Sequence, residues 1–259
     1  MEIQIIHDKS RIWEFLKTNP ELQVYCIGDL DDFFWPKTIW YALVDKSSIC
    51  AIALLYIGME TLTLLAFYES KPDYTYELLT RIKSYLPNKF YAHLSPSLIK
   101  VFGENNIIHY YGRHHKMALR RKPTVVSDKN IRRLSVSDIP VIADFYAFAY
   151  PQNWFDKRMI ETGKYFGYFT DNKLAGVAGI HVYSSEYRVA ALGNIATHPD
   201  YRNRQIGFKL TSVLCADLAE TTDAIGLNVK ADNEYALRCY KKIGFESIGE
   251  FDEYCLKNT

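Results

Sequence analysis

Apolar residues recur with a helical period in two segments of the second half of the chain. The spacing after Arg204 predicts a helix, with apolar side chains at Ile206, Leu210, Val213, Leu214 and Leu218. A second helix is predicted over 233–243, and Gly244 is a suitable residue to end it. An earlier helix, capped by Ser137 and carrying Pro140 in its first turn, is predicted to end near Tyr150. Strand-like apolar runs fill the rest of this half, at 132–136, 165–169, 174–183, 187–197 and 224–229, with a closing strand pair at 245–248 and 251–256.

The first half repeats this order of elements in a weaker form. The predicted elements are strands at 39–44, 50–57 and 61–67, a helix from Pro72 to Leu86, a strand at 90–93, a short helix at 96–102 and a hairpin at 107–119 around Gly112. Two copies of one element order indicate an internal repeat, and the polar segment 120–129 is typical of a linker. We therefore expect an α+β protein with two tandem α/β domains, 1–122 and 129–259, each with a mixed, mostly antiparallel sheet flanked by helices.

Composition narrows the class of function. Hydrophobic residues make up 48% of the 259 residues, and the formal net charge of +1 gives no reason to expect a nucleic-acid partner. No apolar run reaches the ~20 residues that a membrane span needs, and Met1–Gln4 do not resemble the start of a signal peptide. The five cysteines are scattered, which favours reduced thiols in a cytoplasmic protein.

A strand end, a turn and a helix start follow one another between Asn194 and Gly207. The first turn of a helix presents unpaired backbone N–H groups and the positive end of the helix dipole. Such an end is suited to phosphate. The order of elements therefore predicts an anion-binding turn over 202–207.

Together with the last helix, this turn resembles the GNAT superfamily of acyl-CoA-dependent N-acyltransferases. The residues that carry the resemblance are Thr197-His198-Pro199-x-Tyr201-Arg202-x-x-x-x-Gly207, Leu227-Asn228-Val229-x-Ala231-Asp232-Asn233-x-x-Ala236-x-x-x-Tyr240, and Gly244-Phe245 with Gly249-x-Phe251-x-Glu253-Tyr254. They lie in the family's order and separation, and they are most similar to the tandem branch that includes glycine N-acyltransferase-like proteins. The resemblance covers about half of the chain and implies a catalytic domain at 129–259 that binds acetyl-CoA, preceded by a degenerate GNAT-like domain at 1–122.

The resemblance also implies which residues bind the cosubstrate. They lie on the strand end, the anion-binding turn and the last helix: Ile195, Ala196, Thr197, Arg202, Asn203, Arg204, Gln205, Ile206, Gly207, Phe208, Asn228, Asn233, Ala236 and Tyr240. Gln205 stands where the family usually has the first glycine of its pyrophosphate loop. We expect Gln205 to offer its backbone N–H provided that its backbone is helical, and Arg202 and Arg204 to add charge-assisted bonds.

The same resemblance places the Tyr240 hydroxyl at the thioester sulfur, where a phenol can protonate the departing thiolate. Many relatives use a Glu on the strand predicted at 187–197 as general base, and this strand contains none. His181, on the neighbouring strand, is the candidate base because of its ordinary pKa. Glu186 lies at the strand entrance, and Glu253 is either a surface carboxylate or a group that orients the acceptor.

Two clusters in the first half have alternative interpretations. His109, His114 and His115 lack a carboxylate or cysteine that would complete a metal site, so no metal is predicted. The acidic and aromatic run 29–35 is either a loop that packs its aromatic rings inward or one wall of a pocket for a cationic acceptor. The segment from Phe67 to Tyr76 contains no glycine, so the first half is predicted not to bind CoA and instead to shape the acceptor pocket.

The predicted function is transfer of an acetyl group from acetyl-CoA to a primary amine, by direct attack in a ternary complex. The alternatives are a non-catalytic acyl-CoA-binding or regulatory module, and a transferase of a longer acyl or aminoacyl group. The expected partner is a small-molecule or peptide amine, with no nucleic acid and no membrane, and the protein is expected to be a monomer or homodimer.

Overall fold

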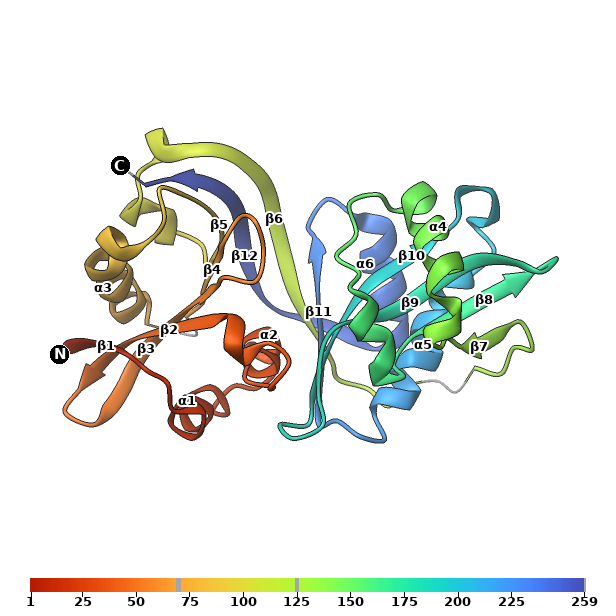
Figure 1. The fold of residues 1–259 in the computed structure, drawn as a ribbon, viewed down its shortest axis with the longest axis horizontal. Helices are drawn as coiled ribbons and strands as arrows, with labels where there is room; N and C mark the ends of the chain where they lie inside the picture. Colours follow the sequence, from red (N-terminus) through yellow and green to blue (C-terminus); the bar gives the residue numbers. More distant parts are fainter. Residues whose placement is uncertain (69–70, 124–125, 259) are drawn as a thin grey trace. The chain divides into compact units, whose positions relative to one another are not determined.

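The computed structural model describes residues 1–68, 71–123 and 126–258, and the chain divides into two compact units (Figure 1). The first unit consists of Met1–Lys116, Val229–Asp232 and Ile248–Thr259, and the second of Met117–Asn228 and Asn233–Ser247. Both units therefore contain segments from distant parts of the sequence. The contiguous domains 1–122 and 129–259 remain a prediction, from which these units differ in the two late segments that join the first unit.

The strands of the first unit are β1 (Glu2–Ile5), β2 (Thr38–Asp45), β3 (Ser48–Tyr56), β4 (Thr63–Ala66), β5 (Lys89–Leu94), β6 (Ile107–Leu119) and β12 (Phe245–Lys257). They form a sheet in the order β1-β2-β3-β4-β5-β12-β6. β4 and β5 are parallel, whereas β1–β2, β2–β3, β3–β4 and β5–β12 are antiparallel. The last strand in sequence thus lies inside the sheet of the first unit, seen as a blue strand between β5 and the yellow β6 in Figure 1.

The helices of the first unit are α1 (Lys9–Leu16), α2 (Val24–Gly28) and α3 (Pro72–Ile82). α3 buries Leu78, Leu79 and Ile82 and packs on β2 and β3. Pro72 fits the first turn of α3, where its missing N–H costs no hydrogen bond. β1, α1 and α2 are elements that the sequence patterns did not predict.

Two hairpin predictions are wrong. The segment 107–119 is the single strand β6, in which Gly112 has a positive φ of 107° without reversing the chain. The pair predicted at 245–248 and 251–256 is the single strand β12, which runs through Gly249 and pairs with β5 from Asp252 to Lys257. Gly249 has no positive φ, so the break between the two predicted strands lies in ordinary strand backbone.

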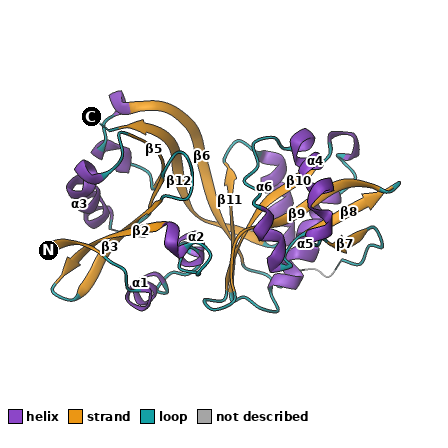
Figure 2. Ribbon diagram, in the orientation of Figure 1, coloured by secondary structure: helices purple, strands orange, loops and turns teal. Residues whose placement is uncertain are grey.

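The strands of the second unit are β7 (Ile131–Arg133), β8 (Phe166–Thr170), β9 (Lys173–Ser184), β10 (Val189–Thr197) and β11 (Ala224–Lys230). Their order is β11-β10-β9-β8-β7, parallel between β10 and β11 and antiparallel elsewhere. The helices are α4 (Ile139–Ala149), α5 (Ile206–Leu218) and α6 (Glu234–Ile243), shown in purple in Figure 2. Ser135 and Asp138, rather than Ser137, form the capping box before α4.

Side chains from helices cover the sheet of the second unit. A Cβ on Gly176 would meet Ile206 and Leu210 of α5, whereas one on Gly179 would meet the ring of Tyr165. Because alternate strand residues face opposite sides, these two glycines mark two covered faces of β9. The sheet is buried on both sides at the strands that carry the site.

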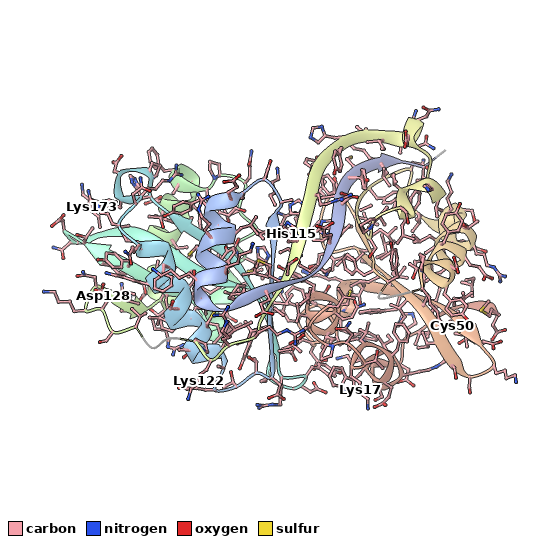
Figure 3. All side chains as sticks on the ribbon, turned by 180° about the vertical axis from the view of Figure 1, so that it is seen from behind. Lys17, Cys50, His115, Lys122, Asp128 and Lys173 are labelled. Carbon is pink, nitrogen blue, oxygen red and sulfur yellow. The ribbon has the colours of Figure 1, made fainter. Side chains whose placement is uncertain are left out.

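The expected fold class, α+β with mixed, mostly antiparallel sheets flanked by helices, is confirmed. Residues 124 and 125 of the predicted linker, and residues 69 and 70 of the segment from Phe67 to Tyr76, lie outside the described residues. At the described end of this linker, Asp128 accepts a hydrogen bond from Lys209 at 2.8 Å; Figure 3 labels Asp128 and Lys122. Across the described ranges, no helix is long and apolar enough to cross a membrane.

Candidate active site

The candidate site begins where β10 and β11 stop pairing. The two strands are paired from Val189 to Leu192 on β10. On its other edge β10 pairs with β9 along its length, with a register shift between Gly193 and Ala196, so Ala196 and Thr197 keep β9 as a partner but not β11. This bulge turns the last residues of β10 away from β11 and leaves backbone edge groups available beside Asn228.

Asn194 lies in the bulge and connects it to the surrounding elements. Its φ of 54° is left-handed, a conformation that Asn tolerates better than most residues. The buried side chain accepts a hydrogen bond from the Trp154 backbone N–H at 3.0 Å and donates one to the Tyr165 hydroxyl at 2.9 Å. Its backbone carbonyl accepts a 2.5 Å bond from the Tyr146 hydroxyl. Asn194 thus holds the loop around Trp154, which precedes the 3₁₀ helix Lys157–Thr162, against the bulge of β10.

Sequence reasoning missed this role of Asn194. The signal available was a polar residue inside an otherwise apolar strand, where an unsatisfied amide would be costly.

The predicted anion-binding turn lies at the start of α5, and its backbone differs from the expectation. Gln205 is not helical: it precedes the helix with φ 58° and ψ 16°, and Asn203 is left-handed as well, at φ 63°. The position where the family usually has glycine therefore keeps the conformation that glycine favours, although a glutamine occupies it. The helix begins at Ile206, and its first hydrogen bond from this turn runs from Lys209 N–H to Gln205 O at 3.0 Å.

Backbone donors of this turn are open to a ligand. Among the described residues, no group accepts a hydrogen bond from the backbone N–H groups of 203–208. Arg202 and Arg204 are exposed, and neither forms an ion pair within the described part of the chain, although Arg204 lies over the Tyr201 ring at 5.3 Å. Gly207 lies beside the end of β10, since a Cβ there would be 3.5 Å from Thr197 Oγ1. The turn therefore offers N–H groups and cationic side chains next to the opening in the sheet.

The helix α6 carries the second predicted group. Asn233 is its N-cap and accepts a hydrogen bond from Ala236 N–H at 3.1 Å, so its carbonyl oxygen is already engaged. Tyr240 is half-buried, and its ring meets the ring of Phe245 edge-to-face with the two ring centroids 5.9 Å apart. Asn233, Ala236 and Tyr240 share one helix face, as their spacing predicts.

His181 lies on β9, where its ring covers Gly193 so closely that a Cβ there would be 2.2 Å from the ring. The residue retains some exposed surface, but its Nε2 is buried. Burial lowers the pKa of His181 to about 4, an effect that a hydrogen bond with Asn194 only partly offsets. The imidazole is therefore neutral at pH 7 and is a weaker base than its ordinary pKa suggested.

The remaining sequence candidates lie apart from this set. Glu186 is in an exposed turn, and Glu253 belongs to the first unit, where its carboxylate lies 3.6 Å from His93 and 3.3 Å from His114. Although burial alone would raise it, these histidines hold the pKa of Glu253 below its usual value. Glu253 is thus an internal ion-pair partner rather than a simple surface carboxylate. In the described ranges, no three His, Cys, Asp or Glu side chains are arranged to hold a metal ion.

The acidic and aromatic run in the first half is largely engaged in packing. Asp32 forms a 2.5 Å ion pair with Lys9, and the Trp35 ring stacks on Trp40 at 6.4 Å. Asp29 is buried, and burial raises its pKa to about 8. These contacts match the interpretation in which the loop packs its aromatic rings inward.

Comparison with known proteins identifies the second half. The acetyltransferase (GNAT) family matches residues 130–245. An uncharacterized protein of Mycobacterium leprae is 38% identical over 105 residues, which are 39% of this chain and 28% of that protein's length.

Solved structures share the fold at low sequence identity. A GNAT-family putative acetyltransferase of Novosphingobium aromaticivorans has a TM-score of 0.61 at 17% identity, over 80% of this chain and 88% of its own. A GNAT-family acetyltransferase of Colwellia psychrerythraea has a TM-score of 0.60 at 14% identity, over 99% and 100%. A tandem GNAT protein from the clavulanic acid biosynthesis pathway has a TM-score of 0.59 at 11% identity, over 100% and 99%. Residues 130–245 therefore belong to the GNAT superfamily, and the solved structures share the fold of the chain.

Proposed function

We propose that the second unit binds an acyl-CoA, with acetyl-CoA as the first candidate, and transfers its acyl group to a primary amine. One observation carries the proposal: the sheet opens after Leu192, next to a turn whose N–H groups at 203–208 have no acceptor within the described residues. A strand edge suits an extended amide-containing arm, and a helix start suits a pyrophosphate. Acyl-CoA cosubstrates contain both groups.

The binding roles follow from this geometry. The edge groups of Ile195–Thr197 pair with the pantetheine amides and polarise the acyl carbonyl, while 202–208 hold the phosphates. Asn228, Asn233 and Ala236 line the other side of the arm. Because Asn233 already caps α6 with its side-chain oxygen, its contribution to a ligand is limited to its Nδ2 group.

In the proposed reaction, the amine nitrogen attacks the thioester carbonyl, an N–C bond forms and the C–S bond breaks. Tyr240 donates its phenolic proton to the departing thiolate, and the proton of the amine leaves to a base or to solvent. His181 is the candidate base on β9. Its pKa of about 4 makes proton transfer from an ammonium ion unfavourable, so the amine must react from its free-base form. The acid limb of the kcat/KM profile should therefore follow the pKa of the acceptor amine.

Calorimetry with acetyl-CoA, followed by a panel of small-molecule and peptide amines assayed for free thiol release, tests the proposal. The double variant Arg202→Gln/Arg204→Gln should weaken acetyl-CoA binding, because it removes two cations from the anion-binding turn. Arg238→Gln is the control, since Arg238 is exposed and, within the described ranges, its one ion pair is with Glu234 on the surface of α6. No binding at millimolar acetyl-CoA, or equal losses in the control, would contradict the proposed site.

The alternatives remain distinguishable in the same assay. Tight acetyl-CoA binding without thiol release for any amine would favour a non-catalytic acyl-CoA-binding module. Faster release from a longer acyl-CoA would assign a different acyl donor to the same site.

A further inference from the structure

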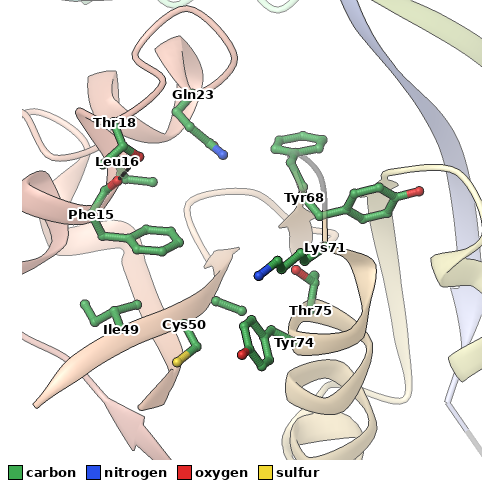
Figure 4. A pocket seen from close by; sticks show the side chains of 12 residues that line it. Phe15, Leu16, Thr18, Gln23, Ile49, Cys50, Tyr68, Lys71, Tyr74 and Thr75 are labelled. Carbon is green, nitrogen blue, oxygen red and sulfur yellow. Dashed lines mark hydrogen bonds between the residues drawn. The ribbon is translucent and has the colours of Figure 1, made fainter. Parts of the chain in front are cut away.

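A cavity in the first unit is separate from every residue assigned above. It has a volume of about 320 Å³, within the range of small-molecule sites. It lies where β3 extends beyond β4, since β4 pairs only with Leu54–Tyr56 and leaves the beginning of β3 next to α1 and α3. Its lining residues come from α1, β3, the end of β4 and the start of α3 (Figure 4).

The cavity is lined by apolar side chains together with a few polar ones. Phe15, Leu16, Ile49, Ala51 and Phe67 provide the apolar lining. These residues would surround a hydrocarbon or aromatic group and exclude water from it. A ligand that fits this part of the cavity therefore has an apolar body.

Gln23 and Thr75 are the polar side chains that distinguish this cavity from a packing defect. Only 7% of the surface of Gln23 and 3% of that of Thr75 is exposed. Neither side chain has a hydrogen-bond partner among the described residues. Figure 4 shows the Gln23 amide and the Thr75 hydroxyl pointing toward the same space. Neither polar group is among the fully buried side-chain atoms that lack a partner, so both remain accessible from the cavity to a ligand or to solvent.

Lys71 adds a charge at the same place. It is exposed, precedes the first turn of α3, and extends past Thr75 so that its ammonium group points into the space beside Phe15 and Cys50 in Figure 4. Among the described residues that line the cavity, Lys71 is the one charged side chain, and Asp73 of the first turn of α3 does not line the cavity. An ammonium, an amide NH₂ and a hydroxyl can all donate hydrogen bonds, and a carboxylate accepts only.

We propose that this cavity binds a small monocarboxylic acid with an apolar body. Its carboxylate accepts hydrogen bonds from Lys71, Gln23 and Thr75, and its tail lies among Phe15, Ile49 and Phe67. The site is separate from the acyl-CoA site, because all of its described lining residues lie in the first unit and none of them is among the residues assigned to acyl-CoA. The proposal stands whether or not the second unit is an acyltransferase.

Octanoate is the probe, titrated into the full chain carrying ¹³C-labelled methyl groups. We expect saturable shifts of the Ile49 and Ala51 methyl signals, with no change when CoA is present at saturation. Octanol and octylamine have the same tail without the carboxylate, and each should bind at least about tenfold more weakly, since the charge-assisted bonds are lost.

Single substitutions test which side chains donate hydrogen bonds to the carboxylate of octanoate. Lys71→Met and Gln23→Leu should each weaken octanoate about tenfold, the loss of one hydrogen bond to a charged group, and leave the unfolding midpoint without ligand nearly unchanged. Lys100→Met is the matched control, because Lys100 is an exposed lysine of the first unit that does not line the cavity. Octanol binding as tightly as octanoate, octanoate shifts confined to residues outside the cavity, or no saturation at millimolar octanoate would each overturn the proposal. The comparison of octanoate with octanol and octylamine uses the unaltered chain. It therefore tests the carboxylate preference of the cavity even if a variant fails to fold.

Discussion

Replacing Gln205 with glycine should stabilise the protein, even though the change lies at the end of a helix. Gln205 has a φ of 58°, where an L-residue costs about 1–2 kcal/mol through the close approach of its Cβ to the backbone. Glycine avoids that cost, but it also has more conformational entropy in the unfolded chain. That entropy lowers the free energy of unfolding by roughly 0.5–1 kcal/mol. The net gain in the free energy of unfolding is therefore about 0–1.5 kcal/mol, with a middle value of ~0.75 kcal/mol, or ~1.5–3 °C in the midpoint for a domain of this size. Urea unfolding followed by circular dichroism measures it directly.

Two matched variants separate backbone strain from side-chain effects. Gln205→Ala keeps the Cβ and should be neutral, because the exposed Gln205 side chain has no partner in the described part of the chain. Asn203→Gly should gain less than Gln205→Gly, because Asn adopts the left-handed region with little cost. If Gln205→Ala stabilised the protein as much as Gln205→Gly, the reasoning from φ would be refuted.

Three further predictions concern the candidate active site. Tyr240→Phe should lower kcat by ~10²–10⁴ with acetyl-CoA affinity nearly intact, because only the departing thiolate needs the proton; wild-type turnover across pH would exclude an acid role. Gly207→Ala should keep or slightly raise the unfolding midpoint, since its Cβ makes an ordinary 3.5 Å contact with Thr197, but weaken acetyl-CoA binding by blocking the phosphate; unchanged binding in calorimetry would contradict this. For His181, the folded pKa of about 4 lies below the unfolded value, so stability falls as pH drops from 6.5 toward 4, by about 1–2 kcal/mol at pH 5. His181→Gln should remove that part of the acid sensitivity, and an unchanged difference in unfolding free energy between pH 7.5 and pH 5 would rule it out.

The sequence predicted the elements of the second unit because each is defined by local pattern. α5 and α6 show the apolar spacing of a helix, and Gly244 ends α6. The strands β8 to β11 are compact apolar runs. The backbone of the predicted anion-binding turn at 202–207 was not predictable in this way. A glutamine gives no sign of a left-handed φ, so the conformation of Gln205 is imposed by the junction of β10 with α5.

The misplaced hairpins and the cavity have a different origin. A hairpin was predicted around Gly112 and a strand pair at 245–248 and 251–256, but partner strands far away in the sequence hold both segments extended. Gln23 and Thr75 come together only after α1, β3 and α3 have packed, so no local pattern connects them. Long-range pairing and burial of single polar groups therefore account for what the sequence did not predict.

The insertion of β12 between β5 and β6 determines when the first unit can be completed during synthesis. The ribosome makes Lys116 roughly 140 residues before Lys257, which at about 5–20 residues per second is a delay on the order of ten seconds. Throughout that time β5 and β6 have open strand edges that invite wrong partners. The second unit, by contrast, has all of its residues once Ser247 is made. A chain that stops at Ser247 would have a complete second unit, but its first unit would lack the strand between β5 and β6. A fragment that begins at the linker would contain the β12 segment without its partner β5.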